Sequence, residues 1–220
     1  MANLGLVVGD SAALTPGDIN IRDTLLTAHT LSIVSDDDAV PGGVTGIVIT
    51  ESVIPATLGS KYVALNLPML CLEVGYWDEL FWTNSNNVNT GSQSEVNIFS
   101  HPITDGVTIP LASAGGMFGT PIGNVTPTAN IFMTSNSVAF PNTHALGWAI
   151  EQGRGLFSGN SLRRNVAISI INNAAANLNA EGQQIILQSV SWMLTPVTPS
   201  FIGGVFSIPI HARRSVVRKW

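Results

Sequence analysis

Leu4-Gly5-Leu6-Val7-Val8-Gly9-Asp10 is the stretch that decides the fold, a short apolar run that ends at a glycine and an aspartate. A continuous apolar run of this length is typical of a strand that is buried on both faces. Thr15-Pro16-Gly17-Asp18 follows, and it offers an N-cap hydroxyl, a proline for the first helical position and a carboxylate for the first turn. The two stretches together predict a buried strand and then a helix that runs to about Ala28.

The alternation of strand and helix continues to residue 74. Apolar runs predict strands over residues 30–35, 46–50 and 68–74, and a short helix over residues 56–64. Strands and helices at this spacing are typical of parallel β-α-β units. We therefore expect an α/β fold with an open, doubly wound, mostly parallel sheet and helices on both of its faces.

After residue 83 the pattern changes to short β-like runs, which glycine, proline and asparagine separate. A polar stretch over residues 83–91 comes first. The runs that follow lie at residues 94–99, 107–112, 129–134, 145–150 and 166–171. They predict antiparallel β additions to the sheet in the second half of the chain.

The chain closes with a predicted helix and an arm. Asn179 is placed to cap a helix whose apolar residues recur at helical spacing up to Leu194, and Pro196 marks its end. We expect residues 1–195 to form one domain and residues 196–220 to form an extended C-terminal arm. The charge-free stretch of the arm is too short and too interrupted by proline and glycine to cross a membrane as a helix.

Charge is scarce and unevenly distributed. Charged residues make up 10% of the chain, against about 25% in an average soluble domain, and hydrophobic residues make up 45%, which excludes a disordered chain. Four of the nine basic residues lie in the last eight positions, so residues 1–212 hold five basic and fourteen acidic side chains, a formal charge of −9. A body this acidic disfavours nucleic acid as the main partner.

The arm is the part of the chain that we expect to bind other protein subunits. Its strand-like apolar residues can add to the sheet edge of a neighbour, while its basic residues meet the acidic body of that neighbour. The apolar set is Val205, Phe206, Ile208 and Ile210, and the basic set is Arg213, Arg214, Arg218 and Lys219. The alternative is a solvated tail that only aids solubility.

The sequence contains no motif that is typical of a cofactor site or of a targeting signal. Cys71 is the only cysteine, so no intrachain disulfide and no cysteine-based metal site can form. We expect no metal, nucleotide or other cofactor. The N-terminal residues lack the basic and apolar regions of a signal peptide, so we expect no classical secretion, and the compartment stays open. His29 follows the first helix, where a cation favours the helix dipole.

Four local patterns occur in order along residues 3–195. They are Gly9-Asp10-Ser11; Ile47-Val48-Ile49-Thr50-Glu51-Ser52-Val53 with Gly59-Ser60-Lys61-Tyr62 and Pro68-Met69-Leu70; His101-Pro102-Ile103-Thr104-Asp105-Gly106; and Ile150-Glu151-Gln152-Gly153 with Trp192 in the closing helix. In this order they resemble the trehalose-utilisation-like (ThuA-like) branch of the class I glutamine-amidotransferase-like superfamily. The resemblance implies a flavodoxin-like sheet. Amidotransferases of this superfamily use a cysteine nucleophile on a strained strand-to-helix elbow, together with a histidine and a carboxylate, and the resemblance implies the same three positions here.

The elbow that the resemblance implies falls near Glu73-Val74-Gly75. Cys71 lies two residues before that turn, and Leu70 and Leu72 stand where a nucleophile on a tight turn needs glycine. We therefore expect Cys71 to be a buried structural thiol and the catalytic cysteine to be missing.

Ligands of open α/β sheets bind beyond the carboxyl ends of the strands. The residues that fall there are Asp10 and Ser11, Glu51 and Ser52, and Glu73 with Tyr76 and Trp77. Three converging carboxylates can bind a cation or a polar sugar, or act as acid and base, and the alternative is that they cap the following helices. Tyr76, Trp77 and Trp82 can stack on a sugar. The alternative is that these aromatic rings pack in the core and at its rim around a short helix.

Three functions follow from these observations. We expect first a non-catalytic structural subunit of a larger assembly, a homo-oligomer that docks through its arm. Its composition is typical of virion proteins, such as phage capsid or tail components. The alternatives are a hydrolase acting on a carbohydrate or amide, and a carbohydrate-binding surface domain.

Overall fold

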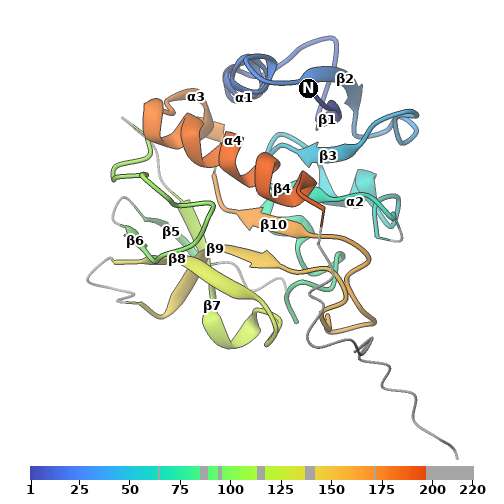
Figure 1. The fold of residues 1–220 in the computed structure, drawn as a ribbon. Coiled ribbons are helices and arrows are strands. Elements are labelled where there is room, and N and C mark those ends of the chain that lie inside the picture. Colours follow the sequence, from blue (N-terminus) through green and yellow to red (C-terminus); the bar gives the residue numbers. More distant parts are fainter. Residues whose placement is uncertain are drawn as a thin grey trace, which may run out of the picture.

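The structure, a computed structural model, describes residues 1–63, 65–84, 89–93, 96–112, 117–136, 142–170 and 172–196. Its centre is a ten-stranded mixed sheet (Figure 1). One half of the sheet is parallel, in the order β2-β1-β3-β4-β10. Its strands are β1 (Asn3–Val8), β2 (Thr30–Ser35), β3 (Gly46–Ile49), β4 (Met69–Cys71) and β10 (Asn165–Ile168). The α/β, flavodoxin-like class expected from the sequence is confirmed.

The other half of the sheet is antiparallel, and β9 is its centre. β9 pairs with β10, β7 and β8, while β5 pairs with β7 and β6 with β8. The bounds are β5 (Asn89–Gln93), β6 (Val96–Ile98), β7 (Met117–Pro121), β8 (Asn130–Ser135) and β9 (His144–Ile150). The predicted antiparallel additions are present, but the strand predicted over residues 107–112 was wrong. Pro110 has no N–H for a ladder and Ile109 is exposed, so that stretch is irregular.

The two faces of the sheet are covered differently. Helices α1 (Pro16–Leu26), α3 (Asn172–Ala176) and α4 (Ala180–Leu194) cover one face, and their apolar side chains share a core with Leu6. The second face is covered by α2 (Pro55–Leu58), by the 3-10 turn η1 (Val74–Tyr76) and by nearby loops, while η2 (Ile122–Asn124) follows β7. The second face has less helix than the sequence predicted, because Gly59, at φ 50°, ends α2 well before residue 64.

The predicted caps of α1 and α4 are confirmed. Thr15 Oγ1 accepts from Asp18 N at 3.1 Å, and Asp18 Oδ2 accepts from Thr15 N at 3.0 Å, which is a reciprocal capping box. Asn179 Oδ1 accepts from Gly182 N at 3.0 Å at the start of α4. No helix among the described residues is long and apolar enough to span a bilayer.

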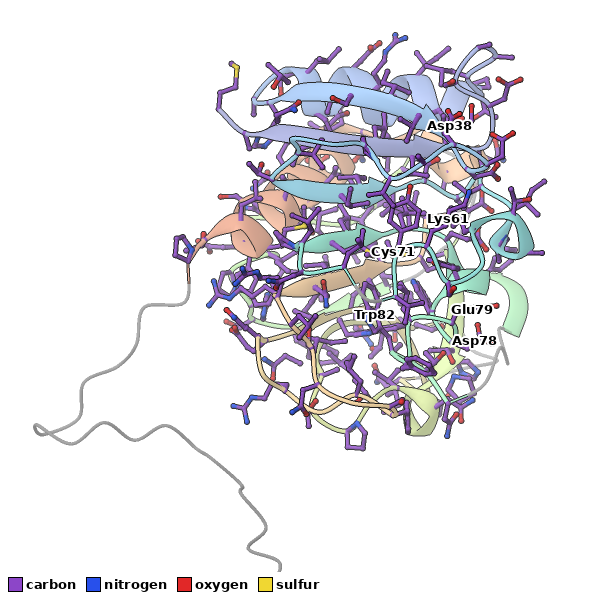
Figure 2. The ribbon with its side chains drawn as sticks, turned by 90° about the vertical axis from the view of Figure 1, so that its right-hand side faces the viewer. Asp38, Lys61, Cys71, Asp78, Glu79 and Trp82 are labelled. Carbon is purple, nitrogen blue, oxygen red and sulfur yellow. The ribbon has the colours of Figure 1, made fainter. Side chains whose placement is uncertain are left out.

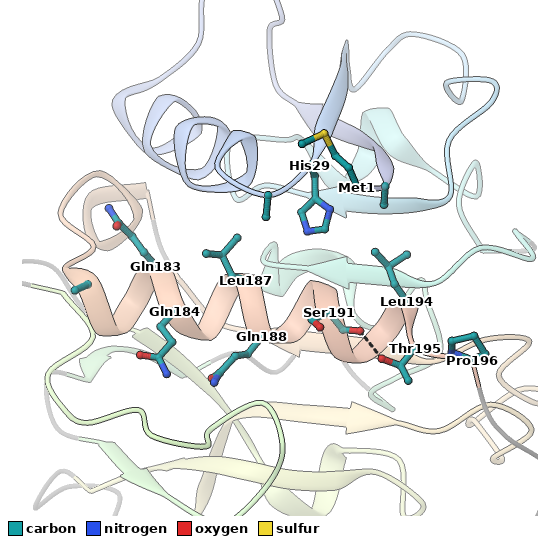
Figure 3. A pocket seen from close by; sticks show the side chains of 13 residues that line it. Met1, His29, Gln183, Gln184, Leu187, Gln188, Ser191, Leu194, Thr195 and Pro196 are labelled. Atoms are coloured by element: carbon teal, nitrogen blue, oxygen red, sulfur yellow. Dashed lines mark hydrogen bonds between the residues drawn. The ribbon is translucent and has the colours of Figure 1, made fainter.

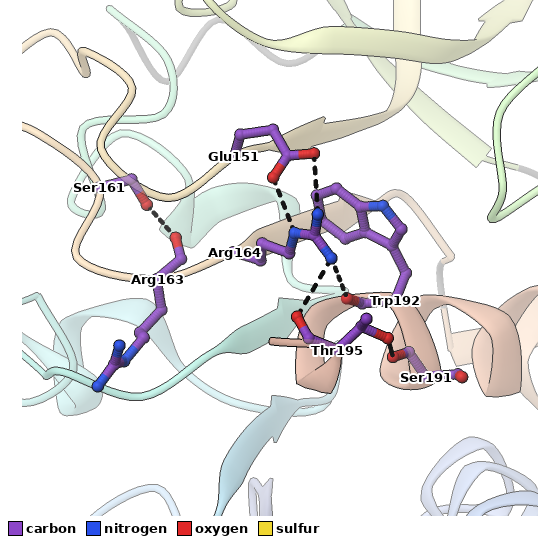
Figure 4. Close-up of polar contacts among 7 residues, drawn as sticks. All are labelled: Glu151, Ser161, Arg163, Arg164, Ser191, Trp192 and Thr195. Atoms are coloured by element: carbon purple, nitrogen blue, oxygen red, sulfur yellow. Dashed lines mark hydrogen bonds and ion pairs between the residues drawn. The ribbon is translucent and has the colours of Figure 1, made fainter. Parts of the chain in front are cut away.

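Arg164 holds the C-terminal end of α4 (Figure 4). Its Nε donates to Glu151 Oε2 at 2.7 Å, and its Nη1 donates to the carbonyl oxygens of Trp192 and Thr195 at 3.3 and 3.2 Å. The guanidinium also lies 4.7 Å from the centre of the Trp192 ring. The last turn of α4 is therefore tied to the ends of β9 and β10.

The arm predicted over residues 196–220 lies outside the described residues, apart from Pro196. That holds for Val205, Phe206, Ile208, Ile210, Arg213, Arg214, Arg218 and Lys219. The domain division at residue 195 and the role of the arm stay predictions.

Candidate functional site

The loops that follow β1 and β3 meet at the carboxyl edge of the parallel half, as expected. Ser52 joins them, because its Oγ accepts from Gly9 N at 2.9 Å and donates to Asp18 Oδ1 at 2.8 Å. Gly9 is required at this contact, since a Cβ there would lie 2.4 Å from the Ser52 carbonyl oxygen. Asp18, which the sequence marked only as a helix cap, is buried and also fixes the β3 loop. Ser52 therefore holds the β1 and β3 loops together at this edge.

Asp10 and Ser11 lie at the exposed start of the β1 loop. Asp10 Oδ1 accepts from Ala12 N at 2.8 Å, and Ser11 bonds to Ser35 Oγ through both its N–H and its hydroxyl, each at 2.9 Å. Asp10 thus bonds within its own loop and does not cap α1, whose N-cap is Thr15. Glu51, in the β3 loop, is near enough to Glu73 for its charge to raise the pKa of that group.

Glu73 lies between β4 and η1, where the sequence placed the elbow. Its backbone is extended, at φ −82° and ψ 109°, without the strain of a nucleophile turn. Its Oε1 accepts from Gly75 N at 2.7 Å, so it caps η1, and the residue is only 8% exposed. Burial, with smaller contributions from the charges of Glu51 and Glu79, raises the pKa of Glu73 to about 8, against the Gly75 N–H bond that lowers it. Glu73 is therefore mostly protonated at neutral pH.

Cys71 is fully buried at the end of β4, as predicted. Its Sγ donates to the Glu73 carbonyl oxygen at 3.5 Å. Burial raises the pKa of the Cys71 thiol well above its usual value. A thiol in this state is a poor nucleophile.

Tyr76, Trp77 and Trp82 belong to the core. They are 0%, 1% and 2% exposed, Tyr76 Oη donates to the Gly59 carbonyl oxygen at 2.8 Å, and Trp77 meets Trp148 edge-on at 4.4 Å between ring centres. No face of these rings is open to a sugar. The structure therefore agrees with the alternative that these aromatic residues pack in the core. Sugar stacking on Tyr76 and Trp77 is not supported.

Asp78 and Glu79 add carboxylates that the sequence analysis did not single out (Figure 2). Burial first, and then the contact with Asp78, raises the pKa of Glu79 to about 7. Only their position after η1 could have marked them in the sequence. Among the described residues, no group of three or more His, Cys, Asp or Glu side chains could hold a metal ion.

A groove along α4 is a second feature that sequence reasoning missed (Figure 3). It has a volume of about 820 Å³, and one of its walls is formed by α4 and Pro196, the other by the start of β1 and the residues before β2. The described residues that line it are Met1, Ala2, Ala28, His29, Ala180, Gln183, Gln184, Leu187, Gln188, Ser191, Leu194, Thr195 and Pro196. They include no Asp, Glu, Lys or Arg.

His29 lies in this groove, and its expected role as a cation was wrong. Burial, followed by the charge of the N-terminal amine, lowers the pKa of His29. The imidazole is therefore neutral at pH 7, and it does not act as the positive charge that a helix C-terminus favours.

No protein-family model matches the chain, and no curated protein matches it significantly. A protein from Parabacteroides merdae described as ThuA-like is 12% identical with a TM-score of 0.54, over 91% of this chain and 92% of that one. A protein from Thermoplasma acidophilum described as a GMP synthase subunit is 11% identical with a TM-score of 0.51, over 87% of this chain and 96% of that one. The chain has the class I amidotransferase-like fold.

In this amidotransferase-like domain the position of the elbow holds a protonated carboxyl group instead of an accessible thiol. Glu73 caps a 3-10 turn there, and Cys71 is enclosed two residues earlier. Among the described residues of this edge, the groups available for acid–base chemistry are Glu73, which can donate a proton, and the nearby charge of Glu51.

Proposed function

We propose that this protein is a non-catalytic structural subunit of a homo-oligomeric assembly, which docks through its C-terminal arm. The observation that carries the proposal is the position of Pro196, the first residue of the arm, in the wall of a groove whose described side chains carry no charge, beside the N-terminal amine of Met1. Surfaces without charged residues at their centre are typical of protein–protein contacts. The low overall charge agrees with this, and composition favours a virion as the assembly.

The chemistry of the crevice supports the same proposal. Ser52 holds two loops together, Glu73 caps η1, and Cys71 is buried with a raised pKa. Each of these groups has a structural role in the fold. An inactive member of an enzyme fold can keep the sheet and use its surface for assembly.

Deleting residues 197–220 tests the proposal. We expect the full chain to form oligomers in light scattering and electron microscopy, and the shortened chain to be a monomer with an unchanged circular dichroism spectrum, because the described fold ends at residue 196. A full chain of the same length in which 197–220 is replaced by a Gly/Ser sequence controls for length. Oligomers of undiminished size after the deletion would contradict the proposal.

A second candidate function is hydrolysis of an amide or glycoside in the crevice. The observation in its favour is the pKa of Glu73, about 8, which makes this carboxyl group a proton donor at neutral pH beside the Glu51 carboxylate. Turnover on a panel of amides and glycosides should then be lost in Glu73→Gln and kept in Glu181→Gln, a change on the distant helix α4. Equal turnover in Glu73→Gln and the unchanged protein would exclude it.

A further inference from the structure

β2 is the outermost strand of the parallel half, and no described strand pairs with its free side. Its six residues, Thr30–Ser35, include no charge and no proline, and its register against β1 has no bulge. Leu31, Ile33 and Val34 are only partly covered by the two cores. Edge strands of natural proteins usually carry charge, proline or a bulge that prevents pairing. β2 has none of these, so its free side can accept another strand.

The hydrogen-bonding phase of this free side follows from the contacts that β2 makes with its neighbours. Thr30 N donates to the Ala2 carbonyl oxygen at 2.9 Å, so Thr30 and every second residue after it direct their backbone groups toward β1. Leu31 and Ile33 therefore direct theirs outward. Ser35 also points outward, but its N–H donates to Asp38 Oδ2 at 2.9 Å and its carbonyl accepts from Asp38 N at 3.1 Å. The free side thus presents two residues and then ends in an aspartate turn.

We propose that residues 206–210 from the arm of a neighbouring copy pair with β2 as a parallel eleventh strand. This inference rests on the proposed function and names the surface that receives the arm. The arm and the strand match in length and in their lack of charge, since residues 205–210 and Thr30–Ser35 are both six residues without a charged side chain. Main-chain pairing at a free edge is a common way to bind an extended segment.

Pro209 restricts the register of this pairing. Proline has no N–H, so in an added strand it must face away from β2. That condition is met whenever Leu31 and Ile33 are aligned with odd-numbered arm residues, and among these registers we take the one that aligns Leu31 with Ser207 and Ile33 with Pro209. Leu31 and Ile33 then bond to the backbone groups of Phe206, Ile208 and Ile210.

The same register brings opposite charges together. It brings Arg213 and Arg214 to the end of β2, where Asp37 and Asp38 are exposed in the turn that follows the strand. Lys61 does not occupy their carboxylates in this structure, because its Nζ donates to the carbonyl oxygens of Asp36 and Asp38, at 2.6 and 3.2 Å. The charge match selects this register among those that Pro209 and the backbone allow.

The reach of the arm bears on whether it comes from a neighbour or from the same chain. α4 packs on β4 and β10, so its end is about four strand spacings, or roughly 19 Å, and one layer of about 10 Å from a strand beyond β2. Residues 197–205 can span at most about 30 Å. Pro196 lines the same groove as Met1 and His29, so the chain's own arm also starts near β2. We assign the arm to a neighbour because the proposed function is an assembly of copies.

Cysteine pairing between two full-length variants tests the inference. One copy carries Ser32→Cys and the other Ile208→Cys, which the register aligns, and each retains the buried Cys71. We expect mixing under mild oxidation to give a disulfide between the copies, with at least about fivefold less product when Ser207→Cys, one residue out of register, replaces Ile208→Cys. No excess over Ser207→Cys would overturn the inference. So would a disulfide that forms only within one chain carrying both cysteines.

Charge reversal gives a second readout. Asp37→Arg and Arg213→Asp should each weaken oligomer formation on the order of tenfold, and the two changes together should restore it. Asp23→Arg, at an exposed position of α1, is the matched control and should leave oligomer formation unchanged. If deletion of the arm abolishes assembly while Asp37→Arg leaves it unchanged, the arm binds elsewhere: the inference fails and the proposed function stands. If deletion has no effect, the proposed function itself fails.

Discussion

Glu73 is a buried side chain whose protonation affects the stability of the fold. It is buried beside Cys71, with the charges of Glu51 and Glu79 near it, and its pKa in the folded chain is about 8, against 4.5 for an ordinary glutamate. Because the folded state binds this proton more tightly than the unfolded state, the contribution of Glu73 to stability is fully present below about pH 4.5. It is lost as the pH rises to 8.

We predict that Glu73→Gln removes this loss. Gln keeps an oxygen that can accept from Gly75 N and carries no charge, so the stability of the variant relative to the unchanged protein should rise by a few kcal/mol between pH 5 and pH 9, since each pKa unit is worth about 1.4 kcal/mol. Urea unfolding at several pH values measures it. Glu181→Gln, on helix α4, is the matched control for the loss of one glutamate charge. A constant difference between Glu73→Gln and the unchanged protein would refute the prediction.

Single residues differ in how well the sequence predicts them. Cys71 and Glu73 could be placed because both positions depend on a local apolar strand and its end. The bond from Ser52 to Asp18 could not, because it joins residues 34 positions apart and depends on how closely two loops approach. Tyr76 and Trp77 had two interpretations, since an aromatic residue after a strand can face a crevice or a core, and only the packing of the second face decides between them.

The start of α1 shows how one element fixes another. Asp18 accepts from Thr15 within the capping box and from Ser52 in the β3 loop, and it is 1% exposed. We predict that Asp18→Ala lowers the free energy of unfolding by about 2–4 kcal/mol, since it removes a cap and leaves partners unsatisfied in a buried site.

Thermal or urea unfolding measures this effect. Asp23→Ala is the matched control on the same helix, because Asp23 is exposed and paired only with its neighbour Arg22. Its cost should stay within about 0.5 kcal/mol. If the two variants lose equal free energy of unfolding, the prediction that the Asp18 cap stabilises the fold is wrong.

The elements that the sequence predicted well are those with their own apolar pattern. β1, β2, β3, α1 and α4 have such patterns together with local caps, and their predicted positions are confirmed within a few residues. β5 and β7 were not predicted, because Asn89–Gln93 and Met117–Pro121 contain glycine, asparagine and threonine in place of alternating apolar residues. These strands depend on partners far away in the sequence.

Across the whole molecule, the few charged side chains are unevenly distributed. The carboxyl edge carries buried and exposed carboxylates, while the groove along α4 has no charged side chain among its described residues. No local pattern could have predicted the groove, because its walls come from both ends of the chain. It forms only when α4 is placed beside the start of β1.

That groove also constrains the symmetry of an assembly. Its walls contain both Pro196, where the arm leaves, and His29, next to the start of β2, so the giving and the receiving ends of one copy lie near each other. Two copies related by a twofold axis could exchange arms reciprocally and close as a pair with no free end. If each copy instead gives to one neighbour and receives from another, the contact is head-to-tail, and a closed ring or an open filament follows.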